Sequence, residues 1–391
     1  ALVSRPFLLL VSGHFLQALG YASMLLLPLY LAALGASRAQ VGTAMALASV
    51  GGLLLRPLAG WAIDALGRRP TVVAGTLALA LGAGLLVGVT EIGPLLWASR
   101  LLVGVGAGTL FTVYFAFAAD VIPDSRRTEG IALFGVSGLA PLAVNPLVGD
   151  LNIAPLEIRW IYPAIAALVL VSMWPALRVP EPPRAAPGAG PAPASVAATL
   201  GARPLWPVWM ATATFSGMVA LFMTFATVAA ADRGIADPAR LWYGYAGAAV
   251  AVRLVGAGLP DRLGPVNVVT PALAAYVGAA LLIAQVDSPL SLLVTGVLAG
   301  VGHGYCFPVL TAQVVTRAPV NRRGAAMAGF TALWELTALA LPPVFGAWAD
   351  RHDDATMFAT AAVLAVGGLA AWAALEHRLV PGRGAAGSGI P

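Results

Sequence analysis

Long apolar segments follow one another along almost the whole chain, separated by short polar interruptions. A membrane-spanning helix needs about 20 mostly apolar residues to cross the hydrocarbon core of a bilayer. Twelve segments fit this requirement: 6–34, 39–61, 70–90, 94–119, 129–151, 159–178, 204–231, 240–260, 265–286, 289–316, 325–349 and 355–376. The pattern predicts an all-α integral membrane protein with twelve transmembrane helices.

The longest polar interruption runs from Val179 to Arg203 and holds six prolines in 25 residues. Such a segment cannot pack a core, so it is typical of a linker. We therefore expect an N-terminal six-helix bundle at 1–178, a cytoplasmic Pro-rich linker at 179–203, a C-terminal six-helix bundle at 204–376 and a flexible tail at 377–391.

The amino-acid composition indicates that the chain is embedded in lipid rather than surrounded by water. Hydrophobic residues make up 59% of it and charged residues 10%, whereas soluble domains carry about 25% charge. The arginines are scattered, without a basic stripe, so nucleic acid is not an expected partner. A single cysteine, Cys306, excludes a disulfide framework and a cysteine-based metal site. No metal or cofactor is expected.

The arginines also predict the orientation of the chain. With a cytoplasmic N-terminus, fourteen arginines fall on the inside, five fall outside and three lie within spans, at 56, 100 and 253. This asymmetry obeys the positive-inside rule. We expect a multi-pass protein of the cell membrane, the inner membrane of a bacterium, with both termini in the cytoplasm.

Three pairs of motifs recur at one offset of 196 or 197 residues. The pairs are Arg56 and Asp64 with Arg253 and Asp261, Gly104–Gly108 with Gly300–Gly304, and Pro123–Arg127 with Pro319–Arg323. Three motif pairs at nearly the same offset indicate an internal duplication, an architecture common among secondary transporters. The two bundles are therefore expected to be pseudo-symmetric around a central cavity.

Several of these motifs resemble those of the major facilitator superfamily, across nearly the whole chain. The run Gly60-Trp61-Ala62-Ile63-Asp64-Ala65-Leu66-Gly67-Arg68-Arg69 resembles the family's loop signature between helices 2 and 3. Gly256 to Gly264 resembles its weaker second copy, with Pro265 in place of a basic residue. Arg100-Leu101-Leu102-Val103-Gly104 is similar to the arginine motif of the fourth helix.

The fifth span loosely matches the Gly/Pro motif that antiporters of this family carry. It contains Gly138-Leu139-Ala140-Pro141 and Asn145-Pro146, so the adjacent Gly-Pro of the family motif is split by two residues. The resemblance is strongest to the proton-linked drug and sugar efflux group, which implies export of a small molecule by proton antiport.

Charged residues near the helix ends are candidates for gating. Asp64 is placed to cap a neighbouring helix and to pair with Arg68 or Arg69, contacts that must break when that face opens. Arg56 and Arg253 each lie about 12 Å inward from the aspartate of their motif by helix rise. The gating set is Arg56, Asp64, Arg68, Arg253 and Asp261. Ligand binding is the alternative role for Arg56 and Arg253, and fixing the topology is the alternative role for Asp64.

Ionisable groups deep in spans are costly and mostly functional. Glu335 lies ten residues into the eleventh span, about 15 Å deep, and a carboxyl among apolar neighbours binds a proton more readily than it does in water. His303 lies near the middle of the tenth span, and Arg100 is a plausible carboxylate partner or anion attractor. We predict proton coupling by Glu335, His303 and Arg100. A permanent pair with an arginine is the alternative for Glu335, and core packing is the alternative for His303.

A polar stripe marks the first span, where His14, Gln17 and Tyr21 follow helical spacing. Such a stripe on an apolar helix is expected to face a cavity rather than lipid. The predicted substrate-lining set is His14, Gln17, Tyr21, Tyr114, Asn145, Tyr305 and Trp334.

These features predict a proton-coupled secondary transporter that works by alternating access on a small organic molecule. Export is the leading hypothesis. Import of an organic anion is the alternative, because three arginines lie within predicted spans. A membrane-embedded enzyme is disfavoured because the sequence contains no Walker loop, HExxH or GxSxG motif. A channel or a sensor is also disfavoured, because a channel would need a repeated ring of pore-lining groups and a sensor a soluble output domain, and neither is visible in the sequence. We expect a monomer.

Overall fold

The computed structural model describes residues 3–123, 126–181, 199, 201–319 and 322–379; the side chains of residues 56, 57, 127–129 and 132 are outside this description. The helices of the first half are α1 (Arg5–Ala22), η1 (Ser23–Leu26), α2 (Leu27–Ala33), α3 (Arg38–Ala65), α4 (Arg68–Leu85), η2 (Leu86–Gly88), α5 (Pro94–Val121), α6 (Arg127–Leu139), η4 (Ala140–Val144), α7 (Leu147–Asp150), η5 (Pro155–Ile161) and α8 (Tyr162–Ala176).

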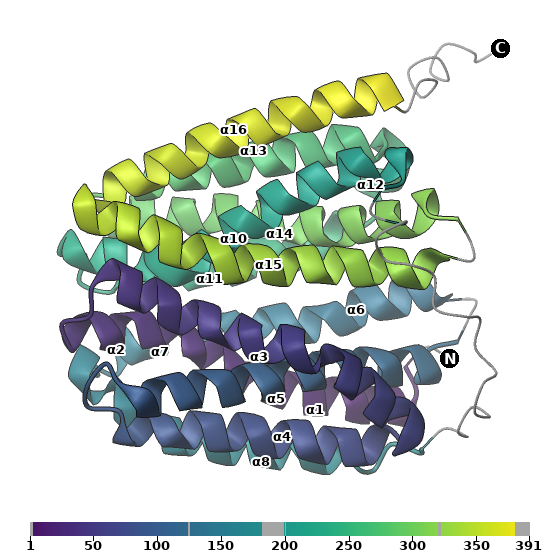
Figure 1. Ribbon diagram of the computed structural model, residues 1–391, viewed down its shortest axis with the longest axis horizontal. Helices are drawn as coiled ribbons and strands as arrows, with labels where there is room; N and C mark the ends of the chain where they lie inside the picture. The colour runs from purple at the N-terminus through teal and green to yellow at the C-terminus, as the bar shows by residue number, and fades with distance from the viewer. Residues whose placement is uncertain (1–2, 124–125, 182–198, 200, 320–321, 380–391) are drawn as a thin grey trace.

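The second half repeats this arrangement (Figure 1). Its helices are η6 (Arg203–Leu205), α10 (Trp206–Asp232), η7 (Pro238–Arg240), α11 (Leu241–Val255), α12 (Leu259–Leu263), α13 (Pro265–Ile283), α14 (Pro289–Arg317), α15 (Arg323–Arg351) and α16 (Asp354–Leu379). Most of the predicted linker and most of the predicted tail lie outside the described residues. The start of α1 and the end of α16 lie at one end of the bundle, here named the termini end; the other is named the Arg38 end.

Within the described residues, eleven helices are long and apolar enough to cross a membrane. The predicted span 240–260 is the exception, because α11 ends at Val255 and the chain bends before α12 begins at Leu259. Gly256 and Gly258 flank the bend and Pro260 follows it, and these residues weaken a helix. With α11 counted as a short span, the arrangement is that of twelve transmembrane helices.

Two other predicted spans are interrupted rather than continuous. The first is divided into α1, η1 and α2, with Pro28 in the first turn of α2. The fifth, predicted as one helix over 129–151, is divided into α6, η4 and α7, with Pro141 at the start of η4 and Pro146 just before α7. Proline has no backbone N–H to donate and its ring clashes with the preceding turn, which explains the break.

The turns that follow the second and eighth spans share one conformation. Gly67 precedes α4 with φ at 101°, and Gly264 precedes α13 with φ at 85°. Side chains disfavour this left-handed region, whereas glycine adopts it freely. The two positions are 197 residues apart, so the duplication read from the motifs extends to the backbone.

Glycines also hold the paired helices of each half together. A methyl group at Gly104 of α5 would collide with the Ala48 carbonyl of α3, and one at Gly300 of α14 would collide with the Tyr245 carbonyl of α11. Small residues of this kind let membrane helices approach closely. The echoed glycine runs are therefore packing surfaces at equivalent places in the two halves.

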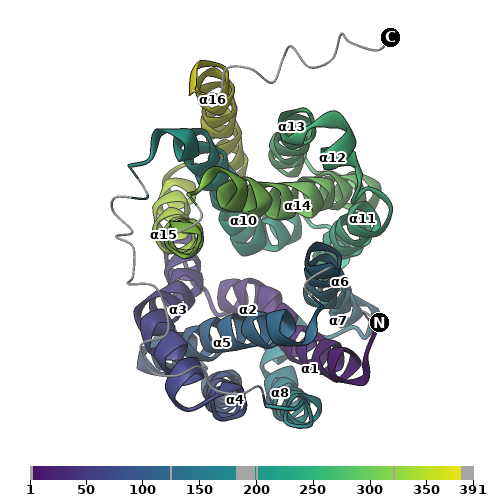
Figure 2. The same cartoon turned by 90° about the vertical axis from the view of Figure 1, so that its right-hand side faces the viewer.

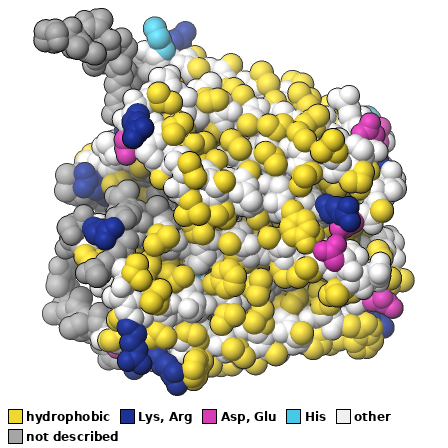
Figure 3. Space-filling view, turned by 180° about the vertical axis from the view of Figure 1, so that it is seen from behind, with side chains coloured by type: hydrophobic (Ala, Val, Ile, Leu, Met, Phe, Trp, Pro, Cys, Tyr) yellow, Lys and Arg dark blue, Asp and Glu magenta, His cyan; other side chains and the backbone are white. Residues whose placement is uncertain are grey.

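Viewed from the termini end, the two six-helix halves lie one beside the other (Figure 2). They meet along two seams: α3 packs against α15, and α11 packs against α6 and η4. The face seen in Figure 3 carries a broad apolar belt, with charged side chains gathered toward the two ends. An apolar belt between charged rims is the surface that a lipid bilayer requires.

Candidate substrate and proton site

Glu335 projects from the middle of α15 toward the other half of the protein. It lies 12 residues after the start of α15, about 18 Å along the helix. Its Oε1 atom would lie 3.6 Å from a methyl group placed on Gly52 of α3. The carboxyl group therefore sits on the α3–α15 seam, near the middle of the bundle.

Tyr21 is close to both this carboxyl group and Arg100. It lies within electrostatic range of both side chains, although they belong to different halves. Its residue surface is nevertheless 41% exposed. Tyr21 is thus an exposed residue close to groups of both halves, and its place in a substrate cavity stays a prediction.

Arg100 is enclosed in the first half, with 2% of its surface exposed. Its Nε donates to the Ala44 carbonyl at 2.9 Å, and Nη2 lies 3.8 Å from the sulfur of Met45. Nη1 is buried and has no hydrogen-bond partner among the described residues. A guanidinium without a carboxylate partner is costly in a bundle interior, which fits a group that changes partners during function.

His303 occupies an aromatic enclosure in the second half, with 8% of its surface exposed. Its Nδ1 and the Tyr245 hydroxyl form a hydrogen bond of 2.5 Å. The rings of Phe215 and Trp334 lie 5.4 and 6.1 Å from the imidazole centroid. Because Trp334 precedes Glu335 in α15, His303 and Glu335 belong to one region of the bundle rather than to opposite surfaces.

His14 lies in a similar enclosure in the first half. Its Nδ1 is 2.6 Å from the Ser137 hydroxyl, and its ring stacks on Phe134 at 4.5 Å between centroids. Gln17 is buried on the same helix. Of the three residues in the predicted stripe, Tyr21 alone has an exposed surface, since His14 packs against α5 and α6 and Gln17 is buried.

Two further predicted cavity residues, Tyr114 and Asn145, lie in the core instead. Both side chains are fully buried; the Tyr114 hydroxyl donates to the Ser172 carbonyl at 3.4 Å, and the Asn145 amide donates to the Leu142 carbonyl at 2.9 Å. They do not line an accessible surface in this conformation. Tyr305 and Trp334 are partly exposed, and Tyr305 packs its hydroxyl against Gly256.

Two aromatic clusters, one in each half at positions related by the duplication, were not predicted. In the first half Phe111 lies 4.7 Å from Phe115 between ring centroids, and Phe115 lies 5.3 Å from Phe134. In the second half Phe307 lies 5.8 Å from Phe330. Phe111 and Phe307 are 196 residues apart, and so are Phe134 and Phe330. The offset of the glycine motifs was the signal that could have revealed these pairs.

Arg253 reaches from α11 toward the first half. A methyl group at Gly135 of α6 would come within 2.5 Å of its Nη1, and its Cζ lies 5.9 Å from the centre of the Phe307 ring. Its Nε is buried without a hydrogen-bond partner among the described residues. The duplicated arginine, Arg56, has its side chain outside the described part of the chain.

The expected pairing of Asp64 with Arg68 or Arg69 is not made in this structure. Asp64 is exposed, whereas Arg68 donates to Asp120 of α5 at 3.0 Å and Arg69 donates to the Val179 carbonyl at 2.7 Å. Both arginines follow the turn at Gly67 and extend toward α5 and the end of α8, and Arg68 also donates to the Ile63 carbonyl of α3 at 3.5 Å. Asp261, the second copy, is also exposed.

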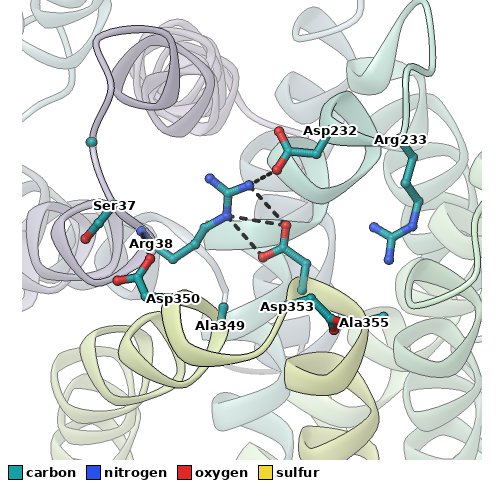
Figure 4. Close-up of a pocket in the computed structure, with 10 residues that line it drawn as sticks. Ser37, Arg38, Asp232, Arg233, Ala349, Asp350, Asp353 and Ala355 are labelled. Atoms are coloured by element: carbon teal, nitrogen blue, oxygen red, sulfur yellow. Dashed lines mark hydrogen bonds and ion pairs between the residues drawn. The ribbon is translucent and has the colours of Figure 1, made fainter.

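The Arg38 end is joined across the halves by a cluster of charges (Figure 4). Arg38 of α3 donates to Asp354 of α16 at 3.0 Å and pairs with Asp232 of α10. Asp350 of α15 accepts from the backbone N–H groups of Arg38 and Ala39 at 2.6 and 2.9 Å, which caps the start of α3.

Two further polar contacts lie at the same end, one local to the start of α16 and one between the halves. Asp353, in the loop before α16, accepts from the Thr356 backbone N–H at 2.6 Å, and this contact holds the pKa of Asp353 below its ordinary value. Tyr243 of α11 donates to Asp150 of α7 at 3.0 Å, a second polar link between the halves.

At the termini end the described ion pairs stay within one half. Arg68 and Asp120 join α4 to α5, while Arg317 and Glu376 join α14 to α16 through contacts of 2.5 and 2.7 Å. The polar contacts between the halves at their ends thus gather at the Arg38 end. No group of three His, Cys, Asp or Glu side chains among the described residues is placed to hold a metal ion.

Comparison with known proteins places residues 10–342 in one family model, described as the Major Facilitator Superfamily. The multidrug resistance protein MdtL of Shewanella oneidensis is 32% identical over 126 residues, which cover 32% of this chain and 31% of that protein. MdtL of Salmonella typhimurium is 34% identical over 126 residues, with the same coverage. The matched segment is therefore about a third of the length of these relatives.

Solved structures support the fold over a greater length. A crystal structure of the nucleoside transporter NupG aligns with a TM-score of 0.80 at 15% identity, covering 95% of this chain and 99% of that one. The human organic anion transporter MFSD10 aligns with a TM-score of 0.67 at 19% identity, covering 94% and 99%. A peptide transporter aligns with a TM-score of 0.76 at 16% identity, covering 95% and 94%. At such identities the likeness concerns the fold alone.

Proposed function

Because the chain belongs to the Major Facilitator Superfamily, and is therefore a membrane transporter rather than an enzyme, we propose that it exports a small organic molecule in exchange for protons. The proposal includes a bacterial inner membrane and cytoplasmic termini, in keeping with the arginine-rich termini end. Its partners are the transported molecule and protons, and the transporting unit is a monomer.

The position of Glu335 carries the proposal. A carboxyl group in the middle of a span is neutral when protonated and charged when it is not, so its proton changes the cost of burying it. Glu335 faces Gly52 of the opposite half, and Tyr21 lies within electrostatic range of it. Binding or loss of a proton at Glu335 therefore changes the charge on the α3–α15 seam, where the two halves must move relative to each other during transport. His303 and Arg100 are the further candidates for the proton path.

The contacts at the two ends support alternating access. In this conformation the Arg38 cluster joins the halves at one end, whereas the described ion pairs at the termini end stay within a half. With cytoplasmic termini, this arrangement corresponds to a protein closed to the outside. Transport then requires the Arg38 cluster to break while new contacts form at the termini end.

Export is favoured over import by two observations. The two MdtL relatives are described as multidrug resistance proteins. In addition, the prolines of the fifth span interrupt the helix between α6 and α7, where antiporters of this family carry their Gly/Pro motif. Proton-driven import of an organic anion is the second candidate, because Arg100 and Arg253 bring unpaired positive charge into the bundle.

Reconstitution in proteoliposomes with an imposed pH gradient tests the function. A thermal-shift screen of the purified protein against metabolites and drugs first supplies a substrate. The proposal expects this substrate to move against the direction of proton flow, and to stop when an ionophore removes the gradient. Movement of substrate and protons in the same direction would replace export with the import alternative, and indifference to the gradient would remove proton coupling altogether.

A further inference from the structure

The positive charge inside the bundle exceeds the negative charge. Among the residues that the sequence places well inside the spans, three are arginines and one, Glu335, is acidic. Burying an unpaired charge in a membrane protein is costly unless a partner or water compensates for it. Arg100 and Arg253 each have a buried guanidinium nitrogen without a hydrogen-bond partner among the described residues, and an anion from outside the chain would supply that partner.

Arg253 is the arginine best placed to meet such an anion. It stands on the seam between α6 and α11, where Gly135 leaves room for its guanidinium group. Tyr245 and His303 lie within electrostatic range of it, and neither of these two supplies a negative charge at neutral pH. Among the described residues no carboxylate pairs with Arg253, so its donors remain available.

The surroundings of Arg253 in the second half are aromatic. Phe307 lies 5.9 Å from its Cζ, within the range of a cation–π contact, and Trp334 lies 5.6 Å from Phe307 between ring centroids. Phe111, the counterpart of Phe307 in the first half, is 39% exposed. Rings of this kind bind flat apolar groups by stacking and edge contacts.

We propose that Arg253, together with Phe307 and Trp334, binds an aromatic organic anion, with the guanidinium group on the carboxylate or sulfonate and the rings on the aromatic part. This inference rests on the proposed transport function and defines its substrate class. It assigns to Arg253 a ligand contact rather than the gating role expected from the motif. Planar donors that match a carboxylate make arginine, rather than lysine, suited to this task.

Equilibrium binding to the purified full chain tests the proposal with three probes of similar shape: 2-naphthoate, 2-naphthamide and 2-naphthylmethylammonium. Quenching of tryptophan fluorescence and thermal stabilisation report binding, and a Trp334→Phe variant identifies the part of the signal that arises beside Phe307. We expect 2-naphthoate to bind about 10- to 100-fold more tightly than the amide, the ratio that corresponds to one charge-assisted contact.

Variants of Arg253 locate the contact. Arg253→Gln is expected to bind naphthoate and naphthamide equally, and Arg253→Lys to keep part of the preference for the anion. Retained binding of the amide shows that Arg253→Gln is folded. Arg262→Gln serves as the matched control, because Arg262 is an exposed arginine of the same half, and it should retain the full preference.

Three outcomes overturn the proposal: equal or tighter binding of the amide or the ammonium probe by the native protein, an anion preference that survives in Arg253→Gln, or no binding of 2-naphthoate and 2-naphthalenesulfonate. The measurement is separable from the transport assay because it uses no gradient and no membrane. An anion that binds through Arg253 but fails to move with a pH gradient would contradict proton coupling and leave the ligand class intact.

Discussion

The Nε of Arg38 donates to Asp354 at 3.0 Å, which ties the first turn of α3 to the first turn of α16 across 316 positions of sequence. The same guanidinium group pairs with Asp232 at the end of α10. Both partners belong to the second half, so the side chain of one arginine makes ion pairs across the halves at the Arg38 end. The Arg38 and Asp354 side chains are mostly buried, and such pairs are costly to break.

Arg38→Gln is therefore expected to shift the population toward a conformation that is open at this end. A reporter cysteine at Ala349, which lines the hollow beside Arg38, should react faster with a maleimide in that variant. The background is Cys306→Ala, since Cys306 is the single native cysteine. A loss of about 1–2 kcal/mol would raise the labelling rate about 5- to 30-fold.

Arg351→Gln is the matched control for this experiment. Arg351 lies at the same end, but its guanidinium group donates to the Ala347 carbonyl of its own helix at 3.0 Å. Its loss should leave the labelling rate of the reporter unchanged. Equal rates in native protein and Arg38→Gln, or equal acceleration in both arginine variants, would mean that the cluster does not hold the halves together.

Glu335→Gln is expected to abolish transport driven by a pH gradient while substrate binding and exchange remain. The amide keeps the shape of the side chain but cannot release a proton, so the seam between α3 and α15 loses its dependence on pH. Counterflow of substrate without a gradient measures exchange in the same proteoliposomes. Glu91→Gln, at an exposed carboxylate in the loop before α5, is the control; a pH dependence that persists in Glu335→Gln would remove this residue from the coupling step.

The length of the hydrophobic segments and the internal duplication of the motifs made the fold predictable from the sequence. Lipid offers no hydrogen bonds to the backbone, so each crossing must be a long apolar helix and is visible in the pattern. The echo of Gly104 by Gly300 likewise predicted equivalent helix pairs, and both glycines lie at close helix contacts. The breaks near Pro141 and Gly256 were not predicted, because membrane helices often continue through such residues.

The site was harder to predict because its members come from distant segments. Glu335 was identified by its chemistry alone, since a carboxyl group inside a span is rare; its role stays a prediction. Nothing local to Arg68 indicates that it pairs with Asp120 rather than with the nearby Asp64. Tyr114 was assigned to the cavity by its polarity, but polarity does not say whether a hydroxyl group faces a space or, as here, a backbone carbonyl.

Alanine at Gly104 or Gly300 is expected to destabilise the protein by about 1–3 kcal/mol, because each new methyl group would overlap a backbone carbonyl of the neighbouring helix. Thermal unfolding in detergent should show lower midpoints for both variants. Gly60→Ala and Gly247→Ala are the controls, since a methyl group there meets nothing within 4 Å. If one of the two echoed glycines tolerates alanine as well as the controls do, the halves are not packed equivalently.

Tyr245→Phe separates a structural role of His303 from a role in proton coupling. Removing the hydroxyl group leaves Nδ1 of a buried imidazole without the partner that now lies at 2.5 Å, a loss of about 1–3 kcal/mol. We expect a lower unfolding temperature, whereas gradient-driven transport per folded molecule keeps its pH profile, because Glu335 carries the proton. Tyr243→Phe, which removes the hydroxyl group that donates to Asp150 at the exposed Arg38 end, should cost less stability. A displaced pH profile in Tyr245→Phe, at normal stability, would instead place His303 on the proton path.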